Sequence, residues 1–221
     1  MPRILITGAS KGLGQVAVKF FEQDGWEVFP FTRKEYDYLK TWNYALPDVE
    51  AIIHCAGGGL GLRGPYITAG QMYELFMTNL GGAMEINRMA LPAMQQKGYG
   101  TIIHIGSIAS GQATGSVGYA TIKGALASYV RCLGRELAPY GVTICGLAPG
   151  GFTAPDNAME RLRATKPEVY ADFIKTRLPR GKMGNAEDLM PLLKLLCSDQ
   201  SGAYCGSMIP VDWGEGVWYS I

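Results

Sequence analysis

The sequence has 221 residues, of which 48% are hydrophobic and 18% charged, and its 20 basic and 19 acidic side chains leave a net charge of +1. This length and apolar content support a large core and exclude a disordered chain. The near-neutral balance gives no electrostatic reason to expect a nucleic acid or a membrane as partner. Glycine is abundant, at 30 residues, which indicates many tight turns or places where the backbone approaches a ligand closely.

The five cysteines form no CxxC pair and are odd in number: Cys55, Cys132, Cys145, Cys197 and Cys205. Each lies in an apolar or helical stretch, so we expect reduced core residues and no metal site. The chain enters its first apolar run without a signal-peptide pattern. It contains no run of about 18 apolar residues that would span a bilayer. These features predict a cytoplasmic protein.

Apolar runs that suit buried strands alternate along the chain with longer helical patterns. The strand runs are 4–7, 27–31, 51–56, 101–105, 142–147 and 207–211. The helical patterns are 12–24, 71–96 with Gly81-Gly82 inside it, 119–139 and 186–198. Strands this apolar, alternating with helices, predict a parallel sheet covered on both faces. The expected fold class is α/β, a single Rossmann-type domain over residues 1–221 with a doubly wound parallel sheet flanked by helices.

Two segments carry little regular pattern. Residues 57–68 are rich in glycine, and residues 149–180 are rich in Pro, Arg and Ala with only a weak helical pattern. Both follow strand runs. Ligand-binding loops of open α/β sheets lie at such positions, so these segments are candidates for the walls of a site.

A glycine-rich turn directly follows the first strand run. It reads Gly8-Ala9-Ser10-Lys11-Gly12-Leu13-Gly14 and leads into the first helical pattern. The three glycines let the backbone turn sharply and approach a pyrophosphate, and the helix N-terminus offers free N–H groups and a positive dipole end. The turn lacks the Gly-Lys-Ser/Thr of nucleotide-hydrolysing P-loops. It predicts dinucleotide binding, with a plain turn as the alternative.

Further motifs follow the glycine turn in a characteristic order. They are His54-Cys55-Ala56-Gly57, Asn79 in the long helical pattern, Ser107 after a strand, Tyr119 and Lys123 as YxxxK, Pro149-Gly150 with Thr153, Arg180 to Gly184, and Val211 to Gly214. With this order the chain resembles the short-chain dehydrogenase/reductase family over almost its whole length. The resemblance extends to members that reduce 3-oxoacyl thioesters with NADPH. It implies an oxidoreductase that transfers hydride between a nicotinamide and a ketone or secondary alcohol.

The resemblance also implies a set of site residues. The catalytic set is Asn79, Ser107, Tyr119 and Lys123. The cofactor-binding residues expected are Gly8, Ser10, Lys11, Gly12, Leu13, Gly14, Arg33, Asp37, Cys55, Ala56, Gly57, Asn79, Tyr119, Lys123, Pro149, Gly150, Phe152 and Thr153. In the family, the segment at 54–57 lies beside the adenosine, and the loop from Pro149 holds the nicotinamide carboxamide.

The chemistry of these residue types suits hydride transfer. Tyr119 and Lys123 are one helical turn apart, so both side chains face one site. A phenol with its usual pKa near 10 is a sluggish acid–base group at neutral pH. We expect the Lys123 ammonium to favour the phenolate, and Ser107 to hydrogen-bond the substrate oxygen. By resemblance, Lys123 also reaches the ribose hydroxyls and Asn79 holds a water that relays protons to solvent.

Cofactor choice depends on the end of the second strand run. No acidic residue stands there to accept hydrogen bonds from a ribose 2′-hydroxyl; Arg33 and Lys34 follow the strand, and Lys11 lies in the glycine turn. Cations at these positions favour NADP(H) over NAD(H), with a solvated charge pair as the alternative. The 17 residues between Arg33 and Ala51 are too few for the strand and helix usual in the family. Asp37 lies near the adenine or on an exposed turn.

Several reactive residue types have simpler interpretations. Tyr36 and Lys40 form a second YxxxK, but no serine precedes them and they are expected on a surface loop. His54 stands where the family has Asn, and as a lone imidazole at a strand end it is expected to be packed, as is His104. Cys55 has no basic partner in sequence and is not expected to be a nucleophile.

The substrate and the assembly are less well specified. Residues 151–180 are expected to cover the site, where Arg161 and Arg163 could meet an anionic substrate or be solvated. The leading function is an NADPH-dependent ketone reductase or alcohol dehydrogenase. A sugar-nucleotide oxidoreductase or epimerase and a non-catalytic dinucleotide sensor are the alternatives. Family resemblance implies a homo-oligomer, either a dimer or a homotetramer.

Overall fold

We describe a computed structural model of the chain, over residues 1–32 and 45–217. Its main sheet has six parallel strands in the order β2-β1-β3-β4-β5-β8. The strands are β1 (Arg3–Thr7), β2 (Glu27–Phe31), β3 (Ala51–His54), β4 (Gly100–Ile105), β5 (Val142–Pro149) and β8 (Met208–Val211). The predicted strands and the α/β doubly wound fold are confirmed.

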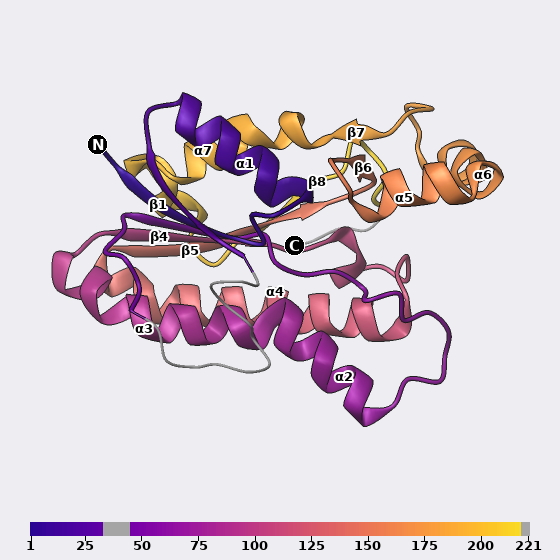
Figure 1. Cartoon of the computed structure of the whole chain (residues 1–221). Helices are drawn as coiled ribbons and strands as arrows, with labels where there is room; N and C mark the ends of the chain where they lie inside the picture. The colour runs from indigo at the N-terminus through magenta and orange to yellow at the C-terminus, as the bar shows by residue number, and fades with distance from the viewer. Residues whose placement is uncertain (33–44, 218–221) are drawn as a thin grey trace.

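Helices cover both faces of this sheet (Figure 1). The helices are α1 (Gly12–Gln23), α2 (Ala69–Phe76), α3 (Gly82–Lys97), α4 (Val117–Leu137), α5 (Ala158–Thr165), α6 (Pro167–Arg177) and α7 (Met190–Leu196). One core cluster joins α1 and α7 to the sheet through Phe21, Ile53 and Leu193, all fully buried. The other joins α3 and α4 through residues such as Ile86 and Val130. Alternate residues of each strand therefore face opposite cores.

The strand order reverses between β1 and β3, because β2 lies on one side of β1 and β3 to β8 lie on the other. In open α/β sheets, ligands bind at the carboxyl ends of the strands where the order reverses. The glycine turn follows β1 and the 54–57 segment ends β3. The sheet thus places both predicted cofactor segments at this point.

The long helix predicted over 71–96 is interrupted. A π-helical turn, Met77–Gly81, separates α2 from α3. Its cause is visible at Asn79, whose side-chain Nδ2 donates to the Leu75 carbonyl at 3.0 Å. The backbone N–H of Gly82 then reaches the Met77 carbonyl, five residues back. Single π turns of this kind are frequent at functional sites.

The segment predicted to be irregular over 149–180 contains two helices, α5 and α6, and the short strand β6 (Phe152–Thr153), which pairs with β7 (Gly184–Asn185). Asn157 caps α5 by accepting from the N–H groups of Met159 and Glu160 at 3.0 and 2.9 Å. Pro167 begins α6. Neither helix has a fully buried residue, which explains the weak pattern in the sequence. Both project beside the carboxyl end of the sheet (Figure 1).

Candidate active site

Ser107 lies just beyond the end of β4. It precedes the short 3-10 helix Ile108–Ser110, and its Oγ accepts a hydrogen bond from the Ala109 N–H at 3.1 Å. This capping bond uses a lone pair and fixes the direction of the side chain. The hydroxyl hydrogen is not used in it, and hydrogen bonding between Ser107 and Tyr119 opposes the rise in the phenol pKa.

Helix α4 presents Tyr119 and Lys123 to the same place, one turn apart. The Lys123 Nζ lies 5.6 Å from the centre of the Tyr119 ring and donates to the Ile105 carbonyl at 2.8 Å. Lys123 is only 3% exposed. Gly115 leaves room at the ring, since a Cβ there would lie 3.1 Å from it. The predicted convergence of Ser107, Tyr119 and Lys123 is present.

Asn79 joins this group from the π turn. Its Oδ1 accepts from the Gly58 N–H at 2.9 Å and its Nδ2 donates to the Gly58 carbonyl at 3.0 Å. A Cβ on Gly57 would lie 2.8 Å from the Asn79 Oδ1 and 3.5 Å from the Lys123 Nζ. Asn79 therefore fixes the glycine-rich loop above Lys123. The proton relay implied for Asn79 stays a prediction.

Burial dominates the electrostatics of the pair. It lowers the pKa of the Lys123 ammonium to about 8, with the neighbouring Cys55 opposing the shift. Burial raises the pKa of the Tyr119 phenol, opposed by the hydrogen bond from Ser107. In the chain alone, desolvation is the largest influence on the Tyr119 phenol and keeps its pKa raised, so the lowering expected from Lys123 is not seen.

Comparison with known proteins agrees with this geometry. The family model for enoyl-(acyl carrier protein) reductase matches residues 37–215. The chain belongs to the short-chain dehydrogenase/reductase family. It is 31% identical to a 3-oxoacyl-acyl-carrier-protein reductase of Mycobacterium avium, over 68% of this chain and 57% of that enzyme. It is 28% identical to carbonyl reductase (NADPH) 2 of Sus scrofa, over 96% and 95%. A family oxidoreductase from Burkholderia thailandensis superimposes with a TM-score of 0.85 at 24% identity, over 97% and 92%.

Family members are oxidoreductases that act on alcohols and ketones, and the segments expected to hold their nicotinamide cofactor adjoin here. A Cβ on Gly8 would lie 2.6 Å from the Ala56 nitrogen, and one on Gly14 would lie 2.4 Å from the Gly8 carbonyl oxygen. Both glycines are therefore required for the turn. Gly12 differs, because its φ of +61° favours glycine while a Cβ there would meet only open space.

The first turn of α1 suits a phosphate. Lys11 precedes the helix without a side-chain cap, and although the Gly12 N–H donates to the Pro155 carbonyl, the positive end of α1 still favours an anion. Ser10 and Lys11 are exposed beside it, and Leu13 is buried in the core. The turn and the open space at Gly12 fit a dinucleotide pyrophosphate.

The loop after β5 reaches the same place. The Pro155 carbonyl accepts from the Gly12 N–H at 2.7 Å, which ties this loop to the glycine turn. Phe152 packs on the core beneath, and the Thr153 hydroxyl hydrogen-bonds the Gly184 carbonyl at 3.3 Å. Pro149 ends β5, and Gly150 follows it and donates its N–H to the Val211 carbonyl at 3.3 Å. A cavity of about 470 Å³ opens on the outer side of Thr153, against α5, away from Ser107 and Tyr119.

Some predicted residues lie outside the described ranges. They are Arg33, Lys34, Tyr36, Asp37 and Lys40. The end of β2 is described: the Phe31 carbonyl accepts from the Ala9 N–H at 3.4 Å. The chain therefore leaves β2 beside the glycine turn.

The two histidines are packed, as predicted. The His54 Nε2 meets the Asn87 Oδ1 at 2.9 Å, and the Asn87 Nδ2 meets the His104 Nε2 at 3.2 Å and the Tyr129 hydroxyl at 3.1 Å. Burial lowers the pKa of His54 to about 4 and that of His104 well below its ordinary value. Burial also raises the pKa of the Cys55 thiol to about 12, so Cys55 is no nucleophile.

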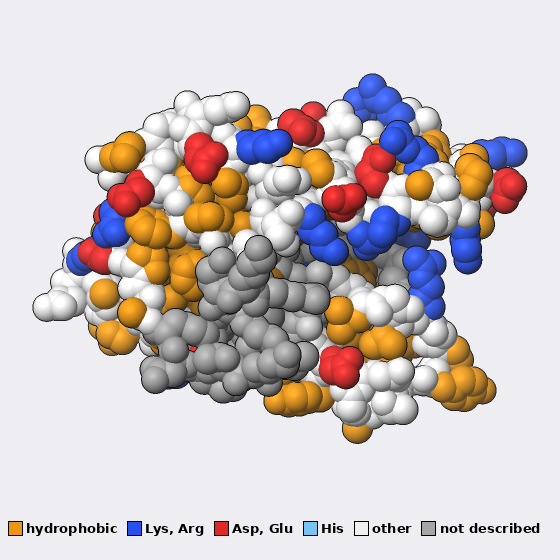
Figure 2. Space-filling model, in the orientation of Figure 1, with side chains coloured by type: hydrophobic (Ala, Val, Ile, Leu, Met, Phe, Trp, Pro, Cys, Tyr) orange, Lys and Arg blue, Asp and Glu red, His pale blue; other side chains and the backbone are white. Residues whose placement is uncertain are grey.

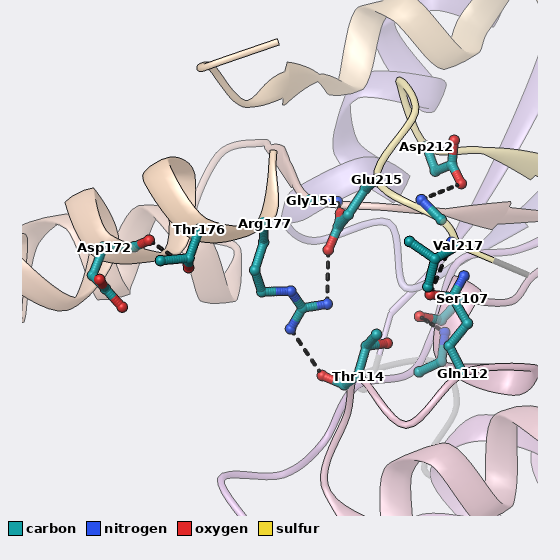
Figure 3. Close-up of polar contacts among 12 residues, drawn as sticks. Ser107, Gln112, Thr114, Gly151, Asp172, Thr176, Arg177, Asp212, Glu215 and Val217 are labelled. Carbon is teal, nitrogen blue, oxygen red and sulfur yellow. Dashed lines mark hydrogen bonds and ion pairs between the residues drawn. The ribbon is translucent and has the colours of Figure 1, made fainter. Parts of the chain in front are cut away.

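Sequence reasoning missed a buried acid beside the site. Glu215 contacts the Gly151 N–H and the Arg177 guanidinium (Figure 3). Arg161 and Arg163 are bonded locally, to the Asp156 carbonyl and to Glu160. The available signal was the motif from Val211 to Gly214, which ends one residue before the acid.

Proposed function

We propose that this chain is an NADPH-dependent oxidoreductase that reduces a ketone, or oxidises a secondary alcohol, with Tyr119 as the proton donor or acceptor. The observation that carries the proposal is the convergence of Ser107, Tyr119 and a buried Lys123 beside Asn79. Two helix residues with no shared function have no reason to bury an ammonium beside a phenol, because burial of a charge is costly.

Each side chain has a role that follows from its contacts. The Ser107 hydroxyl is held by Ala109 and can donate to a substrate oxygen. The Tyr119 phenol, kept protonated by burial, can give its proton to that oxygen. Lys123 is fixed by the Ile105 carbonyl, and its remaining protons can recharge the phenol or bind ribose hydroxyls.

The glycine turn and the loop after β5 would hold the cofactor. A bound NADPH would supply the hydride for the substrate carbon. The residues that would hold it are those predicted at 8–14, at 55–57 and at 149–153, because these segments adjoin through Gly8, Ala56, Gly12 and Pro155. A helix N-terminus beside open space at Gly12 supports binding of the pyrophosphate.

We propose NADP(H) over NAD(H) because Lys11 is exposed at the glycine turn and Arg33 follows β2. Arg33→Asp should shift the ratio of dissociation constants toward NADH by about tenfold or more, because a 2′-phosphate loses its cation and a 2′-hydroxyl gains an acceptor. The matched control is Lys19→Asp, an equal charge change at an exposed position of α1. Titration of both cofactors by fluorescence measures the ratio. An unchanged ratio in Arg33→Asp refutes the assignment.

The substrate class we propose is a 3-oxoacyl thioester. The relative from Mycobacterium avium is named for this chemistry. Lys and Arg side chains gather over α5 and α6 (Figure 2). They include Arg161, Arg163, Lys166 and Lys175, with Arg180 and Lys182 just after α6. Such a surface suits the phosphate that thioester carriers bear.

The deciding experiment is the initial rate of NADPH oxidation with a short β-ketoacyl thioester. Tyr119→Phe should lower kcat by about a thousandfold, because the proton donor is removed while the ring remains. Cofactor binding should persist. Tyr140→Phe, at a half-exposed tyrosine beyond α4, is the control. No turnover by wild-type protein that binds NADPH would contradict this substrate, and equal rates in Tyr119→Phe would contradict the mechanism.

We also propose that residues 1–221 act as one domain and form a cytoplasmic homo-oligomer. Exposed apolar residues on α2, α3 and α4 support an oligomer, among them Tyr73, Met84 and Val117. All five cysteines are free, which suits a reducing compartment. Within residues 1–32 and 45–217, no helix has the length and apolarity needed to cross a membrane.

A further inference from the structure

Glu215 is a buried carboxylate that bridges two other parts of the chain. It is 8% exposed, although it lies near the described end of the chain. Its Oε2 accepts from the Gly151 N–H at 2.5 Å, and its Oε1 pairs with the Arg177 Nη2 at 2.8 Å (Figure 3). A carboxylate is rarely this buried unless both oxygens are satisfied. Here each oxygen has one partner, and each partner comes from a different element.

The turn that carries Glu215 is fixed by Asp212. The Asp212 carboxylate accepts from the N–H groups of Gly214 and Gly216, both at 3.0 Å. Trp213, between Asp212 and Gly214, adopts a φ of +55°, a strained conformation for a residue with a side chain. Its ring lies against Gly184, where a Cβ would come within 2.3 Å. The turn is therefore held on both sides, and Glu215 is presented in one direction.

The loop after β5 is shaped to receive this carboxylate. A Cβ on Gly150 would lie 2.7 Å from the Glu215 Oε2, and one on Gly151 would lie 3.4 Å from it. Glycine at position 150 is what allows the carboxylate to reach the Gly151 N–H. Gly150 belongs to the loop expected to hold the nicotinamide. Glu215 thus holds in place a loop of the proposed cofactor site.

Arg177 uses both arms of its guanidinium within the protein. One arm pairs with Glu215 and the other, Nη1, donates to the Thr114 carbonyl at 3.2 Å. The guanidinium also stacks over Phe173 at 4.9 Å. Because both arms are occupied, Arg177 is set apart from the other cations of α5 and α6 and does not face a ligand. Figure 3 shows it reaching from α6 across to the segment that follows Ser107.

We propose that Arg177 and Glu215 form a clasp that positions α6 and the loop after β5 around the active site, and that both are positioning residues for the reaction. The clasp joins three segments: α6 through Arg177, the loop after β5 through Gly151, and the segment between Ser107 and Tyr119 through Thr114. The proposal rests on the proposed function, since its kinetic effect presupposes turnover at Ser107 and Tyr119.

The clasp predicts a specific kinetic change. Arg177→Met should raise the substrate KM about tenfold, because α6 is released and Glu215 is left buried without its cation. The kcat should change by less than about twofold, because no reacting group is altered. Arg177→Lys should give an intermediate KM, because an ammonium lacks the planar fork that reaches both Glu215 and Thr114.

The matched control is Arg3→Met. Arg3 is paired with Glu27 at 3.1 Å and lies over Phe29 at 5.0 Å, and its side chain is 33% exposed against 30% for Arg177. It lies at the start of β1, at the opposite end of the sheet from the site. This variant removes an ion pair of a similarly exposed arginine far from the site, although its carboxylate is 46% exposed against 4% for Glu215. It therefore reports the effect of losing such a pair where no active-site loop is held.

Hydrogen exchange of the cofactor-free protein supplies a second measurement that needs no turnover. Arg177→Met and Glu215→Gln should accelerate exchange in residues 158–177 and 111–116, and Arg3→Met should not. In the double variant Arg177→Met/Glu215→Gln, the KM should be no higher than in the worse single variant. Either single change already removes the ion pair between the two residues, so the second change removes nothing more. Thermal unfolding confirms that each variant is folded, and Arg177→Lys replaces Arg177→Met if the latter is not.

The outcomes separate the clasp from the proposed function. Unchanged exchange and KM in Arg177→Met, or equal changes in Arg3→Met, overturn the clasp while turnover stands. Additive effects in the double variant also overturn it, since Arg177 and Glu215 would then act separately. If wild-type protein binds NADPH but turns over no substrate, the proposed function fails, and accelerated exchange still supports the clasp.

Discussion

Two polar clusters lie side by side at the carboxyl ends of β3 and β4, and they differ in how their hydrogen bonds are used. In the histidine cluster, His54, His104 and Tyr129 surround Asn87, whose amide is bonded to all three. In the catalytic cluster, Ser107 and Lys123 are each held by one backbone group. The Asn87 amide bonds stay inside the first cluster, where the His54 Nδ1 is buried without a partner, and the second cluster leaves hydrogen-bonding capacity toward the site.

This difference separates structural from functional polar residues better than residue type does. Imidazole is the commoner catalytic group, yet here both imidazoles are stacked at 4.6 Å and buried. A network whose bonds stay internal stabilises one packing arrangement and has no donor for a ligand. Ser107, Tyr119 and Lys123 contact backbone or one another and leave protons to give. The comparison predicts that changes in the first cluster alter stability and changes in the second alter turnover.

Asn87→Leu should give the largest stability loss. The side chain is fully buried, and its replacement leaves His54, His104 and Tyr129 each without a partner. At about 1–3 kcal/mol for each unsatisfied group, unfolding free energy should fall by on the order of 4 kcal/mol. Urea unfolding measures the change. The kcat of the folded fraction should be close to that of the wild type.

Ser107→Ala is the matched change in the catalytic cluster. It removes one capping bond, so stability should fall by only about 1 kcal/mol, whereas turnover should fall by about a hundredfold or more. If Asn87→Leu lowered kcat as strongly as Ser107→Ala does, or if Ser107→Ala were the more destabilising, the contrast between the two clusters would be wrong.

The same contrast explains how much the sequence could predict. The fully buried strand β3 was located at its first residue, Ala51, because an apolar run that follows a turn suits a buried parallel sheet. The edge strand 27–31 was located to the residue although none of its residues is buried. Ser107, Tyr119 and Lys123 were found because their spacing and their order after strands are local features. The packed state of His54 followed from its lack of a sequence partner.

The sequence could not predict side-chain contacts between residues that lie far apart in the chain. Nothing local connects Glu215 to Arg177, which lies 38 residues away, or to Gly151, 64 residues away. The π turn at Asn79 was also missed. A side chain that hydrogen-bonds a carbonyl of its own helix does not change the spacing of the apolar residues in the sequence. The burial that raises the pKa of Tyr119 likewise depends on tertiary packing, which the spacing of residues in the sequence does not encode.

The pH dependence of stability should follow from the histidine cluster. Burial holds the pKa of His54 near 4, against an ordinary pKa of 6.5. The unfolded chain therefore takes up a proton between pH 6.5 and pH 4 that the folded chain refuses. Stability is retained above about pH 6.5 and falls as the pH drops toward 4, by about 3 kcal/mol from His54 alone.

The surroundings of the His54 ring explain why the folded chain does not bind this proton. The His54 Nδ1 is buried without a hydrogen-bond partner, so a proton there would find no acceptor. Burial is the larger influence on the His54 pKa and outweighs the opposing hydrogen bond with Asn87. Urea unfolding at several pH values between 7 and 4.5 measures the slope. His54→Asn should reduce it by about 1.4 kcal/mol per pH unit, the value for one proton. An equal slope in wild type and His54→Asn would show that the loss at low pH comes from other groups, and the histidine cluster would then have no part in it.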